Sequence, residues 1–186
     1  MSNKTTKNLE SEAPAKPKRK IGPIVSSAHL ASGRSSELSE LEFGLIVASN
    51  AFNRWMIHCA SAAGIPDMSP LDVLVLHSSN HRSRAKKVSD ICMVLNIEDT
   101  HTVTYSLKKL LKQELVQSEK RGKETFYSVT DKGAERCKVY SEVRENCLVD
   151  SLKTLGFAKD DLGEVAVLLR GISGLYDQAA RSAASL

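Results

Sequence analysis

The chain has 186 residues, of which 41% are hydrophobic and 26% are charged, as in one globular domain with an appendage. No apolar run reaches the roughly 18 residues of a membrane span, and the Lys-rich start lacks the apolar stretch of a signal peptide. The four cysteines form no CxxC pair, so neither a zinc ribbon nor a disulfide framework is indicated. We therefore expect a cytoplasmic, reduced protein with no membrane partner.

Basic charge gathers in two places. Residues 1–20 hold six basic and two acidic groups, and residues 82–123 hold ten basic and five acidic groups. The stretches 21–81 and 124–186 carry net charges of −3 and −2. A basic middle between acidic flanks favours one face that attracts a polyanion. A solvated charged surface would give the same totals, so the placement of the charges must decide.

A long helix is predicted after a polar N-terminal segment. Residues 1–34 read as a disordered basic tail and an arm, because the first 20 are too polar to repay ordering. The helix begins near Ser36 and ends before Gly64, about 25 residues against a usual mean of about 11–12. Its length favours packing against a partner chain, with burial in a monomer as the alternative. Its apolar and small residues recur at heptad spacing: Leu38, Leu41, Leu45, Ala48, Phe52, Trp55, Cys59 and Ala62.

Three shorter helices are predicted next. The first begins at Ser69-Pro70, where the serine caps and the proline takes the first helical position, and it continues to about Ser79. A basic connection leads to a helix over 88–95 and, after a tight turn, to another over 100–113. Two short amphipathic helices across a tight turn form the helix-turn-helix pattern.

A hairpin and two more helices complete the chain. Strands over 115–120 and 123–129 are joined by an Arg121-Gly122 turn, which makes a winged helix of the preceding motif. A single helix then runs from Thr130-Asp131 to Gly156. A last helix, from Asp160 or Asp161, is expected to bury one apolar face: Leu162, Val165, Leu168, Leu169, Ile172 and Leu175.

Three stretches carry a resemblance to a known family: Lys87–Ile91, Leu110–Val116 and Val129–Gly133. With this order of elements, the chain resembles the multiple-antibiotic-resistance-regulator (MarR) family of bacterial transcription factors. Glu114 departs from the family's usual glycine, and Glu119-Lys120-Arg121 is the nearest equivalent of its Asp-x-Arg wing motif. The resemblance implies a dimeric DNA-binding regulator that acts as a repressor, with Arg121 as the counterpart of the wing arginine.

The expected fold is therefore mainly α with a small β-hairpin: a winged helix-turn-helix plus long dimerisation helices. The expected regions are a tail and arm (1–34), an N-terminal dimerisation helix (35–66), a DNA-binding domain (67–130) and C-terminal dimerisation helices (131–186). A two-fold dimer would place its recognition helices about 34 Å apart, which implies a pseudo-palindromic site. The expected dimerisation residues are Leu38, Leu41, Leu45, Phe52, Leu148, Leu168 and Ile172.

Double-stranded DNA is the expected partner. The second helix of the motif should read base edges with the face opposite its apolar stripe, the wing tip should enter the minor groove, and the basic connection should hold phosphates. That reading face lacks Arg, Asn and Gln, so non-specific DNA binding or protein interaction is the alternative. The predicted DNA-binding residues are Arg82, Arg84, Lys86, Lys87, Thr100, His101, Thr102, Thr104, Tyr105, Lys108, Lys112, Lys120, Arg121 and Lys123.

Other chemistries have less support. By family analogy, a small-molecule effector would lie between the dimer helices and the DNA-binding lobe, near Trp55, His58 and His77. His77 and His81 have a metal-ligating spacing, but no Glu or Cys stands beside them, so no metal or cofactor is expected. There is no Gly-rich phosphate loop, GxSxG or HExxH, so we predict no enzyme. The cysteines fall on apolar stripes, which favours a core role over redox sensing: Cys59, Cys92, Cys137 and Cys147.

Overall fold

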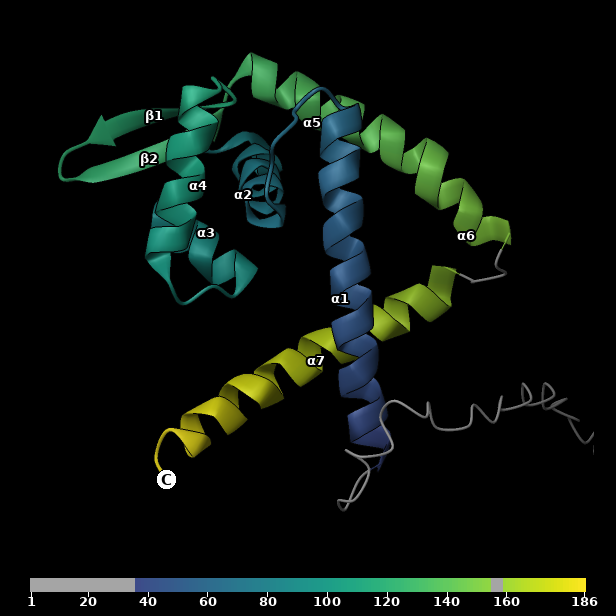
Figure 1. Ribbon diagram of the computed structural model, residues 1–186. Helices are drawn as coiled ribbons and strands as arrows, with labels where there is room; N and C mark the ends of the chain where they lie inside the picture. The colour runs from purple at the N-terminus through teal and green to yellow at the C-terminus, as the bar shows by residue number, and fades with distance from the viewer. Residues whose placement is uncertain (1–35, 155–158) are drawn as a thin grey trace, which may run out of the picture. The chain divides into compact units, whose positions relative to one another are not determined.

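The computed structural model describes residues 36–154 and 159–186 (Figure 1). The predicted tail and arm, residues 1–34, lie outside this part. The chain divides into two compact units, one up to Ser49 and one over Asn50–Leu186. The fold given below is that of the second unit, together with the helix that leads into it.

The mainly helical architecture with one antiparallel hairpin confirms the predicted fold class. The elements in chain order are α1 (Ser36–Ala62), α2 (Pro70–Asn80), the 3-10 turn η2 (His81–Ser83), α3 (Val88–Leu95), α4 (Thr100–Lys112), β1 (Val116–Arg121), β2 (Glu124–Val129), α5 (Asp131–Arg144), the π-helical segment η3 (Glu145–Val149), α6 (Asp150–Thr154) and α7 (Lys159–Ala183).

Helix α2 is the centre of the predicted DNA-binding domain. It begins with a capping box: the Asp72 amide donates to Ser69 Oγ at 3.2 Å, and the Ser69 amide donates to the Asp72 carboxylate at 2.9 Å. Its side chains Val73, Val75 and Leu76 are fully buried. Helices α3, α4 and α5 and strand β2 all contact it. The other elements of the domain therefore pack on α2.

Helices α3 and α4 form the predicted helix-turn-helix. Asn96, in the left-handed region at φ 53°, ends α3, and the Asp99 side chain caps α4 by accepting from the His101 amide at 2.8 Å. The inner face of α4 is the predicted one, with no exposed surface at its apolar residues: Val103, Leu107 and Leu110. The opposite face of α4 is thereby turned outward.

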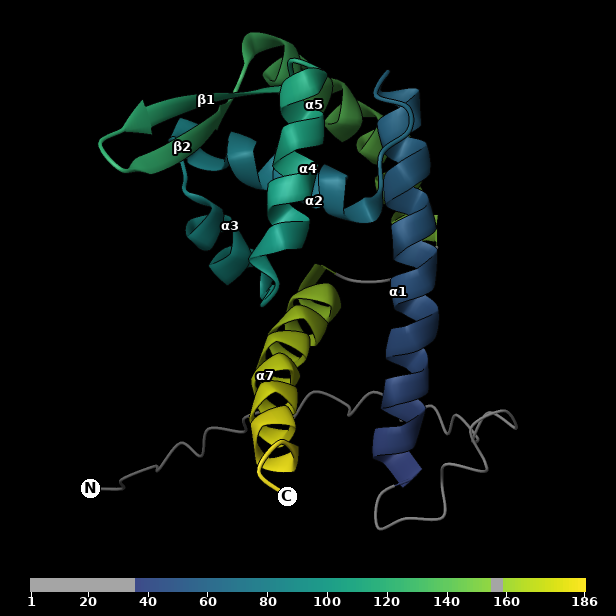
Figure 2. The ribbon, with the colours of Figure 1, turned by 60° about the vertical axis from the view of Figure 1, so that its left-hand side comes forward.

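The wing is a regular hairpin whose turn lies one residue later than predicted. Arg121 still pairs with Glu124, so the turn consists of Gly122 and Lys123. Gly122 adopts φ 62°, which an L side chain rarely adopts. Arg121 therefore belongs to β1. In two views, the hairpin lies beside α4 and extends away from the helices (Figures 1 and 2).

The base of the wing is fixed to the end of α4. The Thr130 amide donates to the Leu115 carbonyl at 3.1 Å, and the Thr130 hydroxyl donates to the Glu114 carbonyl at 2.7 Å. The Gly133 amide donates to the Thr130 hydroxyl at 3.0 Å, and a Cβ at Gly133 would collide with the Leu115 carbonyl oxygen. Glu114, at the position of the family glycine, adopts φ 59°.

The C-terminal helices differ from the prediction in two ways. The helix after the wing is not one regular helix, because an i to i+5 hydrogen bond from the Asp150 amide to the Glu145 carbonyl introduces η3. The apolar face of α7 is not buried: Val165, Leu168 and Leu175 are 51%, 56% and 67% exposed, and only Ile172 of the predicted set is half-buried. Amphipathic spacing identified which face of α7 is apolar, but within residues 36–154 and 159–186 no element buries that face.

Candidate nucleic-acid interface

The outer face of α4 presents the predicted reading residues. Tyr105 is 73% exposed, Thr104 is half-buried, and the remaining members of this face are exposed: Thr100, His101, Thr102, Lys108 and Lys112. The Thr102 hydroxyl donates to the Asp99 carbonyl at 2.7 Å, and the Thr104 hydroxyl donates to the Thr100 carbonyl at 2.8 Å. With their protons engaged in this way, both hydroxyl oxygens are left as acceptors for a base amino group.

A buried ion pair fixes α4 on α2. Lys109 Nζ lies 2.7 Å from the carboxylate of Asp72, a residue only 2% exposed, and also donates to the Asp67 carbonyl. Burial alone would raise the pKa of Asp72, but hydrogen bonds from Lys109, Ser69 and Ser106 lower it below its ordinary value. Lys109 therefore positions the recognition helix. Sequence reasoning missed the pair because its members are 37 residues apart.

The wing tip carries an arginine held by its neighbours. The Arg121 guanidinium lies 2.6 Å from the Glu119 carboxylate and 4.9 Å from the centre of the Phe126 ring. The carboxylate raises the pKa of Arg121, and the guanidinium lowers that of Glu119. Because both side chains are more than half exposed, water weakens this pair. Lys120 and Lys123 are exposed on either side of Arg121.

Lys86 was predicted to lie on the DNA-binding surface, but its side chain is buried. It is 4% exposed, and its ammonium donates to the His81 carbonyl at 2.6 Å and to the Arg84 carbonyl at 3.4 Å. Its backbone exchanges two hydrogen bonds of 2.8 Å with Tyr127 of β2. Burial, followed by the charge of Arg84, lowers the pKa of Lys86. Lys86 therefore shapes the connection between α2 and α3.

The other three basic residues of this connection remain at the surface. Arg82 and Arg84 are exposed, and Arg82 adopts φ 60° within η2. Lys87 is half-buried and bonds to Glu124 of the wing at 3.0 Å, which raises the pKa of Lys87. Two arginines of this connection thus stay available to an anion.

The predicted dimerisation residues lie on exposed or half-buried surfaces. Leu38, Phe52 and Leu168 are 46%, 52% and 56% exposed. The others are partly exposed: Leu41, Leu45, Leu148 and Ile172.

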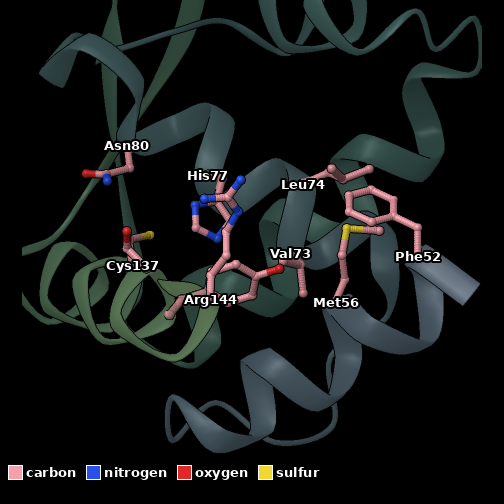
Figure 3. A pocket seen from close by; sticks show the side chains of 10 residues that line it. Phe52, Met56, Val73, Leu74, His77, Asn80, Cys137 and Arg144 are labelled. Carbon is pink, nitrogen blue, oxygen red and sulfur yellow. The ribbon is translucent and has the colours of Figure 1, made fainter. Parts of the chain in front are cut away.

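A cavity of about 450 Å³, here called the α1–α2–α5 cavity, is lined by residues of α1, α2 and α5. Figure 3 shows Phe52 and Met56 at one end and Cys137 at the other. His77 lines it, whereas Trp55 and His58 do not. Among the described residues His77 Nε2 is buried without a hydrogen-bond partner, and burial lowers the pKa of His77.

Burial also changes the pKa of two other groups beside this cavity. It raises the pKa of Cys137 to about 11 and that of Tyr140, whose ring centre is 4.5 Å from that of His77, to about 12. Cys59, Cys92 and Cys137 are buried as expected, but Cys147, which lies in η3, is exposed.

Residues 36–154 and 159–186 contain no group of three or more His, Cys, Asp or Glu that could hold a metal ion. Of the helices described, none combines the length and the apolar character that a membrane span requires.

Comparison with known proteins finds a family model that matches one domain of the chain and solved structures that share its fold. Residues 68–133 match the family model of a winged helix DNA-binding domain. None of the curated proteins compared with the sequence matches it.

Three solved structures share the fold. MarR of Staphylococcus aureus in complex with salicylate and kanamycin is 15% identical, with a TM-score of 0.59 over 76% of this chain and 95% of that chain. Reduced AbfR bound to DNA is 18% identical, with a TM-score of 0.59 over 74% and 92% of the two chains. A mutant MarR from E. coli complexed with operator DNA is 17% identical, with a TM-score of 0.55 over 73% and 98%. At these identities the likeness establishes the fold.

Proposed function

From the premise that this chain carries a winged helix DNA-binding domain and has the fold of the MarR regulators, we propose that it is a transcription regulator. More narrowly, it is a dimeric repressor that reads a pseudo-palindromic operator. The AbfR and E. coli MarR structures named above contain DNA, which supports the DNA partner. Repression is the simplest consequence of a dimer seated on a promoter.

The exposed polar face of α4 is the observation that carries this proposal. His101, Tyr105 and Lys108 project from a helix whose opposite side is fully buried and whose position is held by the Lys109–Asp72 pair. A helix presented in this way fits the major groove, where base edges form a distinct code. The adjoining wing supplies Arg121 for the minor groove, since a water-exposed pair with Glu119 costs little to open.

The dimer would use the long helices outside the winged helix. Apolar residues are exposed on α1 and, separately, on α7; water disfavours their exposure, and a second copy would cover them. Two copies related by a two-fold axis would present two α4 helices about one duplex turn apart.

Selection of bound duplexes from a randomised DNA pool tests the proposal directly. We expect enrichment of a two-fold symmetric site at physiological salt. The Tyr105→Ala variant should lose enrichment at specific positions, whereas Lys138→Gln, on an exposed part of α5, should not. Salt-sensitive binding without an enriched site would instead mean that the protein holds phosphates alone, which is the non-specific alternative.

The wing is tested by the salt dependence of DNA binding. Arg121→Ala should weaken binding and reduce the slope of log K against log salt by about one unit, because one charge is removed from the interface. An unchanged slope would remove Arg121 from the DNA interface.

A second function, effector sensing, is favoured by the α1–α2–α5 cavity and the unpartnered Nε2 of His77. We propose that a small aromatic ligand binds there. Salicylate, which the S. aureus MarR structure contains, is a suitable probe, and calorimetry measures its binding. Ser141→Trp, which fills the cavity from its exposed rim, should abolish salicylate binding. Equal binding to this variant would exclude the cavity.

A further inference from the structure

A second cavity, of about 460 Å³, lies within the DNA-binding domain itself. It is bounded by α2, by η2 and the connection that follows it, and by the end of α3, and we call it the α2–α3 cavity. Its volume falls in the range of about 300–1,000 Å³ that is typical of small-molecule sites. It is separate from the α1–α2–α5 cavity, although Leu74 and His77 of α2 border both.

One wall of the α2–α3 cavity is basic. His81, Arg82 and Arg84 line it, and none of its lining residues in the described chain is a carboxylate. The Lys86 ammonium donates to the carbonyls of His81 and Arg84, so the segment that bears the two arginines is tied around a buried cation. The charges of Arg84 and Arg82 add to the effect of burial in lowering the pKa of Lys86, although Asp90 acts in the opposite direction. The local potential is therefore positive and incompletely compensated.

The same lining also contains aliphatic side chains and is partly open to water. Leu74 and Leu95 line it from α2 and α3 and are half-buried, whereas Val94 is 66% exposed; His77 and Ser78 of α2 complete the lining. An exposed valine at the edge of a cavity is a surface that the body of a ligand can cover. An arginine pair and aliphatic groups in one lining together suit a molecule with an anionic head and an apolar body.

We propose that the α2–α3 cavity binds an amphipathic carboxylate, its head between Arg82 and Arg84 and its hydrocarbon on Leu74, Val94 and Leu95. The planar guanidinium groups suit a carboxylate, which they can hold through paired hydrogen bonds. The same two arginines belong to the proposed DNA interface. A bound carboxylate would therefore neutralise charge that otherwise holds phosphates, and DNA affinity would fall. This coupling rests on the proposed function, whereas the binding of the carboxylate does not.

Calorimetry on the full chain without DNA tests the site. Octanoate should bind with one molecule per chain, and acetate (head alone) and 1-octanol (tail alone) should each bind at least about tenfold more weakly. The double variant Arg82→Gln/Arg84→Gln should weaken octanoate binding by about tenfold or more. Acetate or 1-octanol binding as tightly as octanoate would overturn the proposal.

Two matched pairs of variants locate the site. Val94→Trp fills the α2–α3 cavity and should abolish octanoate binding, whereas Met93→Trp, at a neighbouring residue that is 78% exposed and outside the lining, should not. Ser141→Trp, which fills the α1–α2–α5 cavity, should also leave octanoate binding intact. Circular dichroism establishes that each variant is folded. Loss of binding in Ser141→Trp but not in Val94→Trp would place octanoate in the other cavity and overturn the assignment.

Fluorescence anisotropy with a labelled duplex then separates this inference from the proposed function. We expect octanoate to weaken DNA binding by the wild type and by Met93→Trp, but not by Val94→Trp. If octanoate binds as described and DNA affinity does not change, the coupling is wrong and the site stands. If the protein binds no DNA, the proposed function fails, and calorimetry alone decides the site.

Discussion

Helices α4 and α7 are both amphipathic, but the part of the chain that the structure describes covers the apolar side of α4 and not that of α7. In α4 the residues Val103, Leu107 and Leu110 have no exposed surface, whereas in α7 Leu168 and Leu175 remain more than half exposed. The spacing of apolar residues identifies the buried side of a helix but does not identify what buries it. For α4 the cover is α2 and α3, and for α7 we propose a second copy of the chain.

The largest expected effect tests this difference at α7. Replacement of both Leu168 and Leu175 by Glu should convert the proposed dimer to a monomer, because burial of the exposed parts of two leucines per chain would contribute about 5 kcal/mol across a two-fold interface. The winged helix should keep its secondary structure. Light scattering gives the mass, and Arg170→Glu, a charge reversal on the other side of α7, is the matched control. A double variant that stays dimeric would show that this face of α7 does not hold the dimer.

A smaller but still large effect is expected where the winged helix is most closely packed. Gly133→Ala places a Cβ against the Leu115 carbonyl oxygen, and should lower the free energy of unfolding by about 3 kcal/mol. Gly44→Ala, where nothing lies within 4 Å of the added Cβ, should not destabilise the protein. Urea denaturation measures both variants. Equal stability of Gly133→Ala and the wild type would mean that the base of the wing adapts.

The Lys109–Asp72 pair should have an intermediate effect. Lys109→Met leaves a buried carboxylate without its cation and should cost about 2 kcal/mol at neutral pH, less than for a fully buried pair because Lys109 is 29% exposed. The folded pKa of Asp72 is lowered, so its stabilisation is present above the unfolded value of about 3.9 and is lost as pH falls through the folded value. The difference between wild type and variant should therefore shrink below about pH 4. A difference that is constant with pH would assign the effect to packing.

The smallest effect is a gain in stability at Glu114. Because Glu114 adopts φ 59°, Glu114→Gly should raise the free energy of unfolding by about 1 kcal/mol. The lost ion pair with Lys132 is exposed and contributes little. Glu114→Gln keeps the strained backbone and serves as control in the same thermal melts. A lower melting temperature for Glu114→Gly than for Glu114→Gln would show that the side chain contributes more than the strain costs.

Local signals in the sequence predicted most of the DNA-binding domain. The capping serine at Ser69 fixed the start of α2, and the apolar spacing in α4 fixed its inner face. The inward turn of Lys86 and the pairing of Lys109 with Asp72 were not predicted, because both depend on contacts between separate elements. The same limit applies to α7, whose apolar face is left exposed by the described residues.

The bonds among Glu114, Leu115, Thr130 and Gly133 join the end of α4 to the base of the wing. This junction joins the two proposed DNA-reading elements into one unit, in which the protein sets the distance between the helix and the hairpin. A duplex would have to match that separation through the width of its own grooves. Sequences with the right groove width would then be favoured even at base pairs that no side chain touches.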